Sequence, residues 1–173
     1  MQRNSGAMVA AGVAIAALIV GCGEVSGTAQ PVSNELFDPC AVVPDEAIRA
    51  AGADPAVVSD SLIGERANQT SDVCIWAAET YYLTVLSSVE SQGTVIDDPR
   101  YESRRMVELP GRPTAYELRR PDPIGTAPCD ISFPWSRGMV IVNVESKASS
   151  AGVIDNCSRA ISAASVLSPT LPR

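Results

Sequence analysis

The chain has 173 residues, a net charge of −7 at pH 7 and no histidine. A chain this acidic lacks the basic footprint that nucleic-acid binding requires, which excludes nucleic acid as a partner. Without histidine, the Ser-His-Asp and Cys-His catalytic arrangements and histidine-ligated metals are excluded as well. No Cys-x-x-Cys pair and no glycine-rich phosphate loop occurs either. The sequence therefore predicts no metal site and no cofactor.

The N-terminal segment has the pattern of an export signal. Ala7 to Val20 is a run of 14 residues without a charge, and it follows Arg3. At about 1.5 Å per residue the run spans roughly 21 Å, less than the ~30 Å hydrocarbon core of a bilayer. This length is typical of a signal peptide and not of a permanent membrane span.

The segment ends in Ile-Val-Gly-Cys22, which is similar to a bacterial lipobox. The similarity implies that diacylglycerol is attached to the Cys22 thiol and that the chain is cleaved before this residue. An ordinary signal peptide with an incidental cysteine is the alternative. Lipidation would anchor the protein at the extracytoplasmic face of the cell membrane, since two or three acyl chains hold a protein stably there.

Three parts follow from this interpretation. Residues 1–21 are the predicted lipoprotein signal peptide. Residues 22–36 are the predicted lipidated tether, because residues 23–35 are rich in Gly, Ser, Thr, Gln and Pro and show no apolar period. Residues 37–173 are the predicted single folded domain, which is long enough to bury a core.

The first half of this domain begins with a short helix. Pro44 and the two acidic residues after it suit the start of the helix, and Gly52 suits its end. A loop over residues 53–70 contains a short strand near Val57. Residues 73–89 are rich in aromatic and β-branched side chains and predict two strands joined by a turn. Residues 97–105 are polar and predict a helix.

The second half is mostly strand. Residues 107–109 and 115–118 predict two strands around a Pro-Gly-Arg-Pro turn, and residues 129–135 predict a third. In residues 139–144, alternating valines predict a strand with one buried face. Asp155 or Asn156 begins a last helix. Together these elements predict an α+β domain, an antiparallel sheet of about five strands with an N-terminal and a C-terminal helix packed on one face.

Four cysteines remain in the predicted domain, and an exported domain with four cysteines typically forms two disulfides. Three pairings exist. We favour Cys40–Cys74 and Cys129–Cys157, because each bond would join a helix to a strand that the sheet places beneath it. Loops of this length make each bond worth roughly 3–4 kcal/mol.

Several of these features occur together in one known family. They are the lipobox and tether, Phe-Asp-Pro-Cys40, Cys74-Ile-Trp, Gly111-Arg-Pro, Cys129-Asp-Ile and a final Cys157 on a helix. This pattern resembles the actinobacterial, mycobacterial-type lipoproteins that share a domain of unknown function, over most of residues 37–167. The resemblance implies location, architecture and paired cysteines, and it brings no catalytic residue.

Two sets of side chains are candidate binding sites. Aromatic residues of the predicted strands would line an apolar ligand pocket between sheet and helix; core packing is the alternative. The members of this set are Trp76, Tyr82, Phe133 and Trp135. Arg100, Arg104 and Arg105 form a basic cluster that would grip phosphate groups of envelope lipids, or else lie on a solvated face.

The sequence predicts a non-enzymatic protein. It is a membrane-anchored envelope lipoprotein whose domain binds an envelope lipid or a protein partner. The alternative is a carboxylate-based hydrolase of cell-wall glycan, for which the adjacent acidic pair Asp97 and Asp98 is the candidate. Adjacent acids at the start of a helix are more often helix caps.

Overall fold

The computed structural model describes residues 36–60, 70–122, 124 and 126–173. In this part of the chain one antiparallel sheet has seven strands in the order β1-β2-β3-β7-β6-β5-β4. The strands are β1 (Val57–Ser59), β2 (Ser71–Ala77), β3 (Tyr81–Ser88), β4 (Ser103–Leu109), β5 (Arg112–Arg119), β6 (Cys129–Trp135) and β7 (Gly138–Ser146). The helices are α1 (Pro39–Val42), α2 (Asp45–Ala50), α3 (Gln92–Ile96) and α4 (Asn156–Leu167), with a 3-10 turn at Ala148–Ser150.

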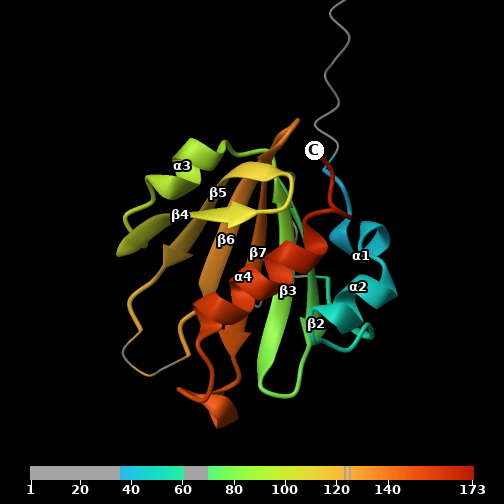
Figure 1. Cartoon of the computed structure of the whole chain (residues 1–173), viewed down its shortest axis with the longest axis vertical. Helices are drawn as coiled ribbons and strands as arrows, with labels where there is room; N and C mark the ends of the chain where they lie inside the picture. The colour runs from blue at the N-terminus through green and yellow to red at the C-terminus, as the bar shows by residue number, and fades with distance from the viewer. Residues whose placement is uncertain (1–35, 61–69, 123, 125) are drawn as a thin grey trace, which may run out of the picture. The chain divides into compact units, whose positions relative to one another are not determined.

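The order of the strands brings distant parts of the chain together. After the β2–β3 hairpin the chain passes through α3 to the far edge of the sheet and returns strand by strand. The last strand, β7, then pairs with β3 in the middle of the sheet, with Val85 opposite Val142. Figure 1 shows α4 crossing in front of this sheet, and the C-terminus beside the segment that leads into α1.

Alternation along β7 separates the two faces of the sheet. Val140, Val142 and Val144 are fully buried and lie in the same core as Ala160 and Leu167 of α4. We call this side the α4 face. The opposite side, the α3 face, has a smaller buried cluster in which Val95 and Tyr101 pack with Leu118 and Met139. Period-two alternation therefore builds a core on each side of the sheet.

The prediction of an α+β domain with about five strands and two helices is wrong. The described sheet has seven strands, and its helices are few and short. The polar residues 97–105 account for part of the error. Ser91 Oγ caps the start of α3 by accepting a hydrogen bond from the Thr94 amide, and this helix ends at Ile96, before residues 97–105 begin. Residues 103–105 instead begin β4, whose charged side chains suit an edge strand exposed to solvent.

Other local predictions are confirmed. Asp155 is the N-cap of α4 and accepts hydrogen bonds from the amides of Cys157 and Ser158. The two disulfides join Cys40 to Cys74 and Cys129 to Cys157, with Cα–Cα distances of 5.2 and 5.0 Å. The predicted signal peptide, the tether and Cys22 lie outside the described residues. Among the residues described, none belongs to a helix of sufficient length and apolarity to cross a membrane.

Candidate functional site

A small pocket lies where the β4–β5 turn, the end of β6 and the last residue of the sequence meet. Its volume is about 250 Å³, which corresponds to roughly eight water molecules at ~30 Å³ each. The walls are mainly apolar, and the cationic groups come from two arginines. The lining residues are Gly111, Arg112, Pro113, Thr114, Pro134, Trp135 and Arg173. We call it the Arg112 pocket.

Arg112 is the most constrained side chain of this pocket. Only 4% of the residue is exposed, and its guanidinium group stacks over the ring of Phe133 at 4.7 Å from the centroid. One terminal nitrogen donates to the carbonyl oxygens of Ser168 and Leu171, at 3.0 and 2.6 Å. The Nε atom is buried without an acceptor among the described residues. A buried donor that lacks an acceptor is costly, so this one calls for an explanation.

The second cation, Arg173, lies over the β4–β5 turn. A Cβ atom added to Gly111 would come within 3.2 Å of the Arg173 guanidinium nitrogen Nη2. Burial, and then the charge of Arg173, lower the pKa of Arg112. Within the described ranges, neither arginine forms an ion pair with a carboxylate. The pocket therefore has two guanidinium groups that lack an ion-pair partner among the residues that the structure describes, in a chain whose net charge is −7.

The rim of the pocket is tied to the start of the folded domain. Trp135 packs edge-on against Phe37 with a centroid distance of 5.2 Å, and its indole nitrogen donates to the Ser88 carbonyl at 3.3 Å. Ser87 Oγ in turn donates to the Phe37 carbonyl at 2.8 Å. These contacts fix the point at which the chain enters the domain beside the Arg112 pocket.

The four aromatic residues predicted to line a pocket lie in different places. Trp135 lines the Arg112 pocket. Trp76 and Phe133 are 2% and 0% exposed in the core on the α4 face. Tyr82 is 38% exposed and, by strand alternation, lies on the α3 face, where the Lys147 ammonium lies 5.2 Å from its ring centroid. Core packing, the alternative for this set, describes Trp76 and Phe133.

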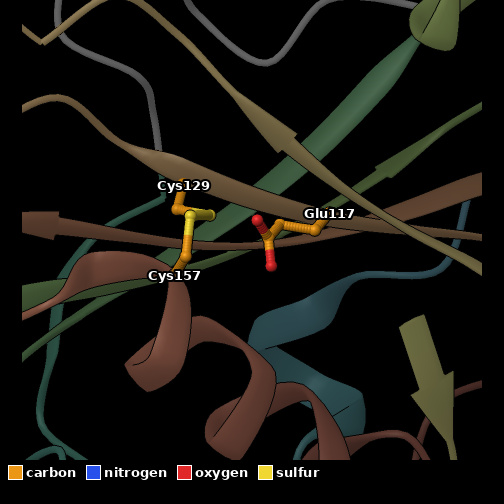
Figure 2. A group of neighbouring side chains, drawn as sticks. All are labelled: Glu117, Cys129 and Cys157. Atoms are coloured by element: carbon orange, nitrogen blue, oxygen red, sulfur yellow. A yellow bond between two sulfur atoms is a disulfide. The ribbon is translucent and has the colours of Figure 1, made fainter. Parts of the chain in front are cut away.

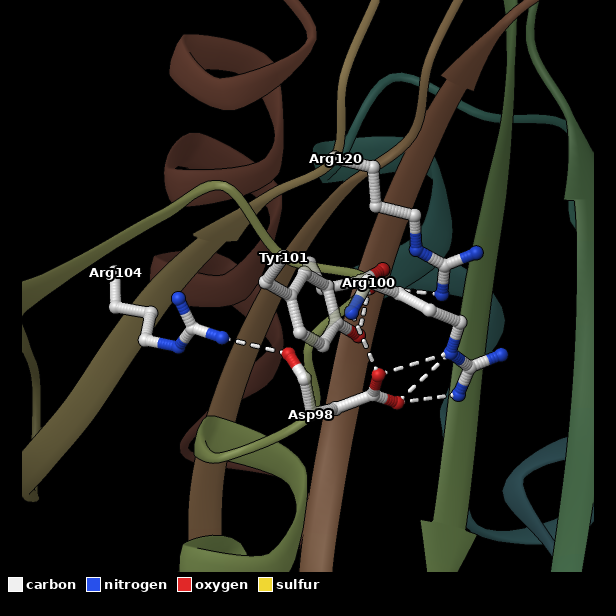
Figure 3. A network of polar contacts seen from close by, with 6 residues as sticks. Asp98, Arg100, Tyr101, Arg104 and Arg120 are labelled. Atoms are coloured by element: carbon white, nitrogen blue, oxygen red, sulfur yellow. Dashed lines mark hydrogen bonds and ion pairs between the residues drawn. The ribbon is translucent and has the colours of Figure 1, made fainter.

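The predicted basic cluster is occupied by partners within the domain. Arg100 binds the Asp98 carboxylate at 2.6 and 2.8 Å, and Arg104 donates to the Asp98 carbonyl at 2.6 Å, as Figure 3 shows. Arg105 forms an ion pair with Glu117. None of the three contributes to the lining of the Arg112 pocket. Because each makes contacts inside the domain, the cluster has no arrangement that favours phosphate.

The acidic pair Asp97–Asp98 follows α3 and does not begin a helix. Asp97 is the C-cap of α3. Hydrogen bonds from the Arg100 side chain and backbone lower the pKa of Asp98 to about 2, so this carboxylate stays ionised at neutral pH. An ionised carboxylate cannot serve as the general acid of glycoside hydrolysis. Asp98 is therefore not the general acid that such a hydrolase requires.

A polar cluster covers the sheet next to this pair. Asp130 is buried on the α3 face and accepts hydrogen bonds from Tyr101 at 2.5 Å, from Arg120 at 3.3 Å and from Asn143. Burial, followed by the charge of Asp130, raises the pKa of Tyr101 to about 12. Tyr101 therefore remains a hydrogen-bond donor across the physiological range. The Arg120 Nε atom is buried without an acceptor among the described residues, so the network is satisfied only at Asp130 and Tyr101, whose contacts fix the packing of this face.

Figure 2 shows a third group, in which the Glu117 carboxylate lies beside the Cys129–Cys157 disulfide. The carboxylate and the two sulfur atoms all lie within 4.8 Å of one another. Metals bind the cysteine thiolate, whereas both sulfurs here are joined in the disulfide. Glu117 is also engaged by Arg119 at 2.7 Å and by Arg105. The group therefore does not fit a metal ion, and its role is structural.

Glu117 makes the stability of the domain depend on pH. Its carboxylate is 2% exposed; burial raises its pKa, but the hydrogen bonds and charges of Arg119 and Arg105 outweigh burial and hold the pKa below the ordinary value of 4.5. A carboxylate with a lowered pKa stabilises the fold above its unfolded-state pKa, and this contribution is lost as pH falls through the folded-state value.

We expect Glu117→Gln to reduce the free energy of unfolding at pH 7 by about 1–2 kcal/mol, because both arginines are partly exposed and screened. Urea denaturation between pH 7 and pH 3 should show the difference from wild type shrinking below pH 4.5. Asp45→Asn is the matched control, since its ion pair with Arg49 is exposed on both sides; its effect should stay under about 0.5 kcal/mol. A Glu117→Gln difference that is unchanged at pH 3 would contradict this account.

The structure thus defines a sheet-rich, doubly disulfide-linked domain with a small cationic pocket beside its point of entry. Residues 17–170 match the family model described as "Protein of unknown function (DUF3558)". The chain belongs to this family. No curated protein and no solved structure shows a significant similarity to it.

Arg112 and Arg173 were not among the site residues predicted from the sequence. Arg112 is part of the Gly111-Arg-Pro pattern that the family resemblance includes, and an arginine placed between glycine and proline at a turn was the available signal. Arg173 gave no signal, because its place in the pocket depends on how the chain returns after α4.

Proposed function

We propose that this protein is an actinobacterial-type lipoprotein of the cell envelope and that its domain binds a small ligand in the Arg112 pocket without catalysing a reaction. Diacylglycerol on Cys22 anchors it at the extracytoplasmic face of the cell membrane. The observation that carries the binding function is the buried Arg112, whose Nε atom has no acceptor among the described residues and which shares the pocket with a second cation.

Three observations support the location. The lipobox-like Ile-Val-Gly-Cys22 follows a run too short to span a bilayer. Both disulfides are of the kind that persists in an oxidising compartment outside the cytoplasm. The family match begins at residue 17, inside the hydrophobic run, and includes Cys22.

The lipid anchor is tested by replacing Cys22. Wild-type protein recovered from membranes of an expressing bacterium should begin at Cys22 and have the mass of diacylglycerol added on this residue. Cys22→Ala should abolish the addition completely, because only the thiol forms the thioether. Mass spectrometry of the N-terminal peptide measures both outcomes.

Ser26→Ala is the control for this experiment, since it lies in the predicted tether four residues beyond the lipobox-like segment. It should be lipidated like the wild type. A wild-type Cys22 that is recovered without lipid would refute the anchor, and the Arg112 pocket would then belong to a protein held in the envelope by other means.

A further inference from the structure

We infer that the Arg112 pocket recognises a phosphate group attached to an apolar body. This inference rests on the proposed binding function and names the ligand class for the same site. It follows from three features of the pocket: its uncompensated charge, its apolar walls and its position in the domain.

The charge is the first feature. Arg112 is held in the protein interior by two carbonyl oxygens and the Phe133 ring, none of which neutralises its charge. Arg173 adds a second guanidinium group close enough to disfavour the charged form of Arg112. An oxyanion between the two would relieve their repulsion and form charge-assisted hydrogen bonds with both.

Phosphate suits two arginines better than carboxylate does. A carboxylate has two oxygen atoms and a single charge, and one guanidinium group already satisfies it in a bidentate pair. A phosphate monoester has three acceptor oxygens and a charge between −1.5 and −2 at pH 7. It can therefore accept hydrogen bonds from Arg112 and Arg173 at the same time.

The walls and the size of the pocket define the rest of the ligand. Pro113, Pro134 and Trp135 offer apolar surface next to the cations. A volume of about 250 Å³ holds a phosphate and only the first few carbon atoms of its substituent. A longer apolar chain would have to leave the pocket along its rim, where Trp135 packs against Phe37.

The position of the pocket points to the membrane as one source of such a ligand. Phe37 is the residue at which the predicted tether of residues 22–36 enters the domain. A flexible tether of about 14 residues has a root-mean-square reach of roughly 20 Å. With Cys22 lipidated, the pocket would stay within reach of lipid headgroups that end in a phosphate monoester, while free phosphate monoesters of the envelope remain the other source of the same chemistry.

The test uses the full chain in dodecyl maltoside micelles, which contain no phosphate. Isothermal titration calorimetry compares octyl phosphate, inorganic phosphate and octanol as probes. We expect octyl phosphate to bind and octanol not to bind. Tighter binding of octyl phosphate than of inorganic phosphate indicates a lipid-type ligand, and equal binding indicates a free phosphate; both results support the recognition of phosphate.

Arg173→Ala should weaken the binding of octyl phosphate at least tenfold, a change of about 1.4 kcal/mol. Arg173→Lys should weaken it less, since the charge remains but the planar fork is lost. Arg49→Ala is the control, because it removes an exposed arginine of α2 that pairs with Asp45, and it should leave the affinity unchanged. Thermal unfolding of each variant confirms that the fold is intact.

Two outcomes would overturn the inference. Octyl phosphate that binds equally well to wild type and to Arg173→Ala would show that the cations do not select it. If octanol binds as tightly as octyl phosphate, phosphate is not the recognised group. The pocket would then still be an apolar binding site, and the proposed function would stand. The absence of binding by all three probes would refute both.

Discussion

Replacing Cys129 and Cys157 together by alanine is expected to lower the free energy of unfolding by about 3–4 kcal/mol. The disulfide joins the start of β6 to the first turn of α4, across a sequence separation of 28 residues. Closing a loop of this length restricts the unfolded chain by about that amount in the chain-entropy model. Both cysteines are also buried in the core, so the alanines leave small cavities.

Urea denaturation under oxidising and reducing conditions measures this effect. To separate the contributions of the two disulfides to stability, the measurement is also made on the double variant Cys40→Ala with Cys74→Ala. The separation of 34 residues between these cysteines predicts a similar loss. In reductant, the wild type should be less stable than each double variant measured under oxidising conditions, since the reduced wild type has lost both bonds and each oxidised variant keeps one. A loss under about 1 kcal/mol for Cys129→Ala with Cys157→Ala would show that the bond does not secure α4 to the sheet.

Replacing Gly138 by alanine should be similarly damaging, for a steric reason. Gly138 begins β7 directly after the β6–β7 turn. A Cβ atom there would lie 2.0 Å from the Ser88 carbonyl oxygen and 2.8 Å from the Val89 Cα. Both are backbone atoms in or beside β3, so no side chain can move away to make room. The hairpin itself would have to shift, and we expect a loss of about 3 kcal/mol or more.

Gly152→Ala is the matched control for this prediction. Gly152 has a φ of +70°, but a Cβ atom there would meet nothing within 4 Å. Its replacement costs only the backbone penalty of about 1–2 kcal/mol. Thermal unfolding should therefore show a melting temperature lowered by roughly 10 °C for Gly138→Ala and by a smaller amount for Gly152→Ala. Equal decreases in melting temperature for the two variants would mean that β7 tolerates a Cβ atom at position 138.

Gly138→Ala is also expected to affect the Arg112 pocket. The Ser88 carbonyl that Gly138 approaches also accepts the hydrogen bond from the Trp135 indole. A shift of the hairpin would move Trp135 away from Phe37 and open one wall of the Arg112 pocket. Close packing at Gly138 therefore positions Trp135, which lines the Arg112 pocket.

Features decided by local chemistry were predictable from the sequence. The alternating valines of β7 and the Asp155 cap of α4 depend on side-chain period and on one capping group. The disulfide pairing also followed, because each helix had one strand cysteine that an antiparallel sheet could place beneath it.

Features decided by sheet topology were not predictable from the sequence. Arg100 and Arg104 would share one face of a polar helix, yet Arg104 lies on the edge strand β4, where half of the side chains face solvent in any case. The helix before them begins at Gln92 and is capped by Ser91, which lies outside the predicted range. The first residues of β4 were therefore assigned to a helix, because its charged residues leave no apolar alternation there.

The pocket was the least predictable feature. Arg112 and Arg173 are brought together only because the segment after α4 returns to the β4–β5 turn, where Ser168 Oγ donates to the Pro110 carbonyl at 3.1 Å. Aromatic content pointed to Trp135 but equally to the core residues Trp76 and Phe133. The pocket depends on how the segment after α4 packs against the β4–β5 turn, and no periodic pattern in the sequence predicts this packing.

Native mass spectrometry of the full chain, released from the membranes of an expressing actinobacterium, tests the central claim most directly. The account predicts a non-covalent adduct whose fragments include a phosphate group, present on the wild type and on Arg49→Ala and lost from Arg173→Ala. A wild-type protein that is lipidated at Cys22 but has no such adduct, or an adduct that Arg173→Ala retains in full, would contradict it.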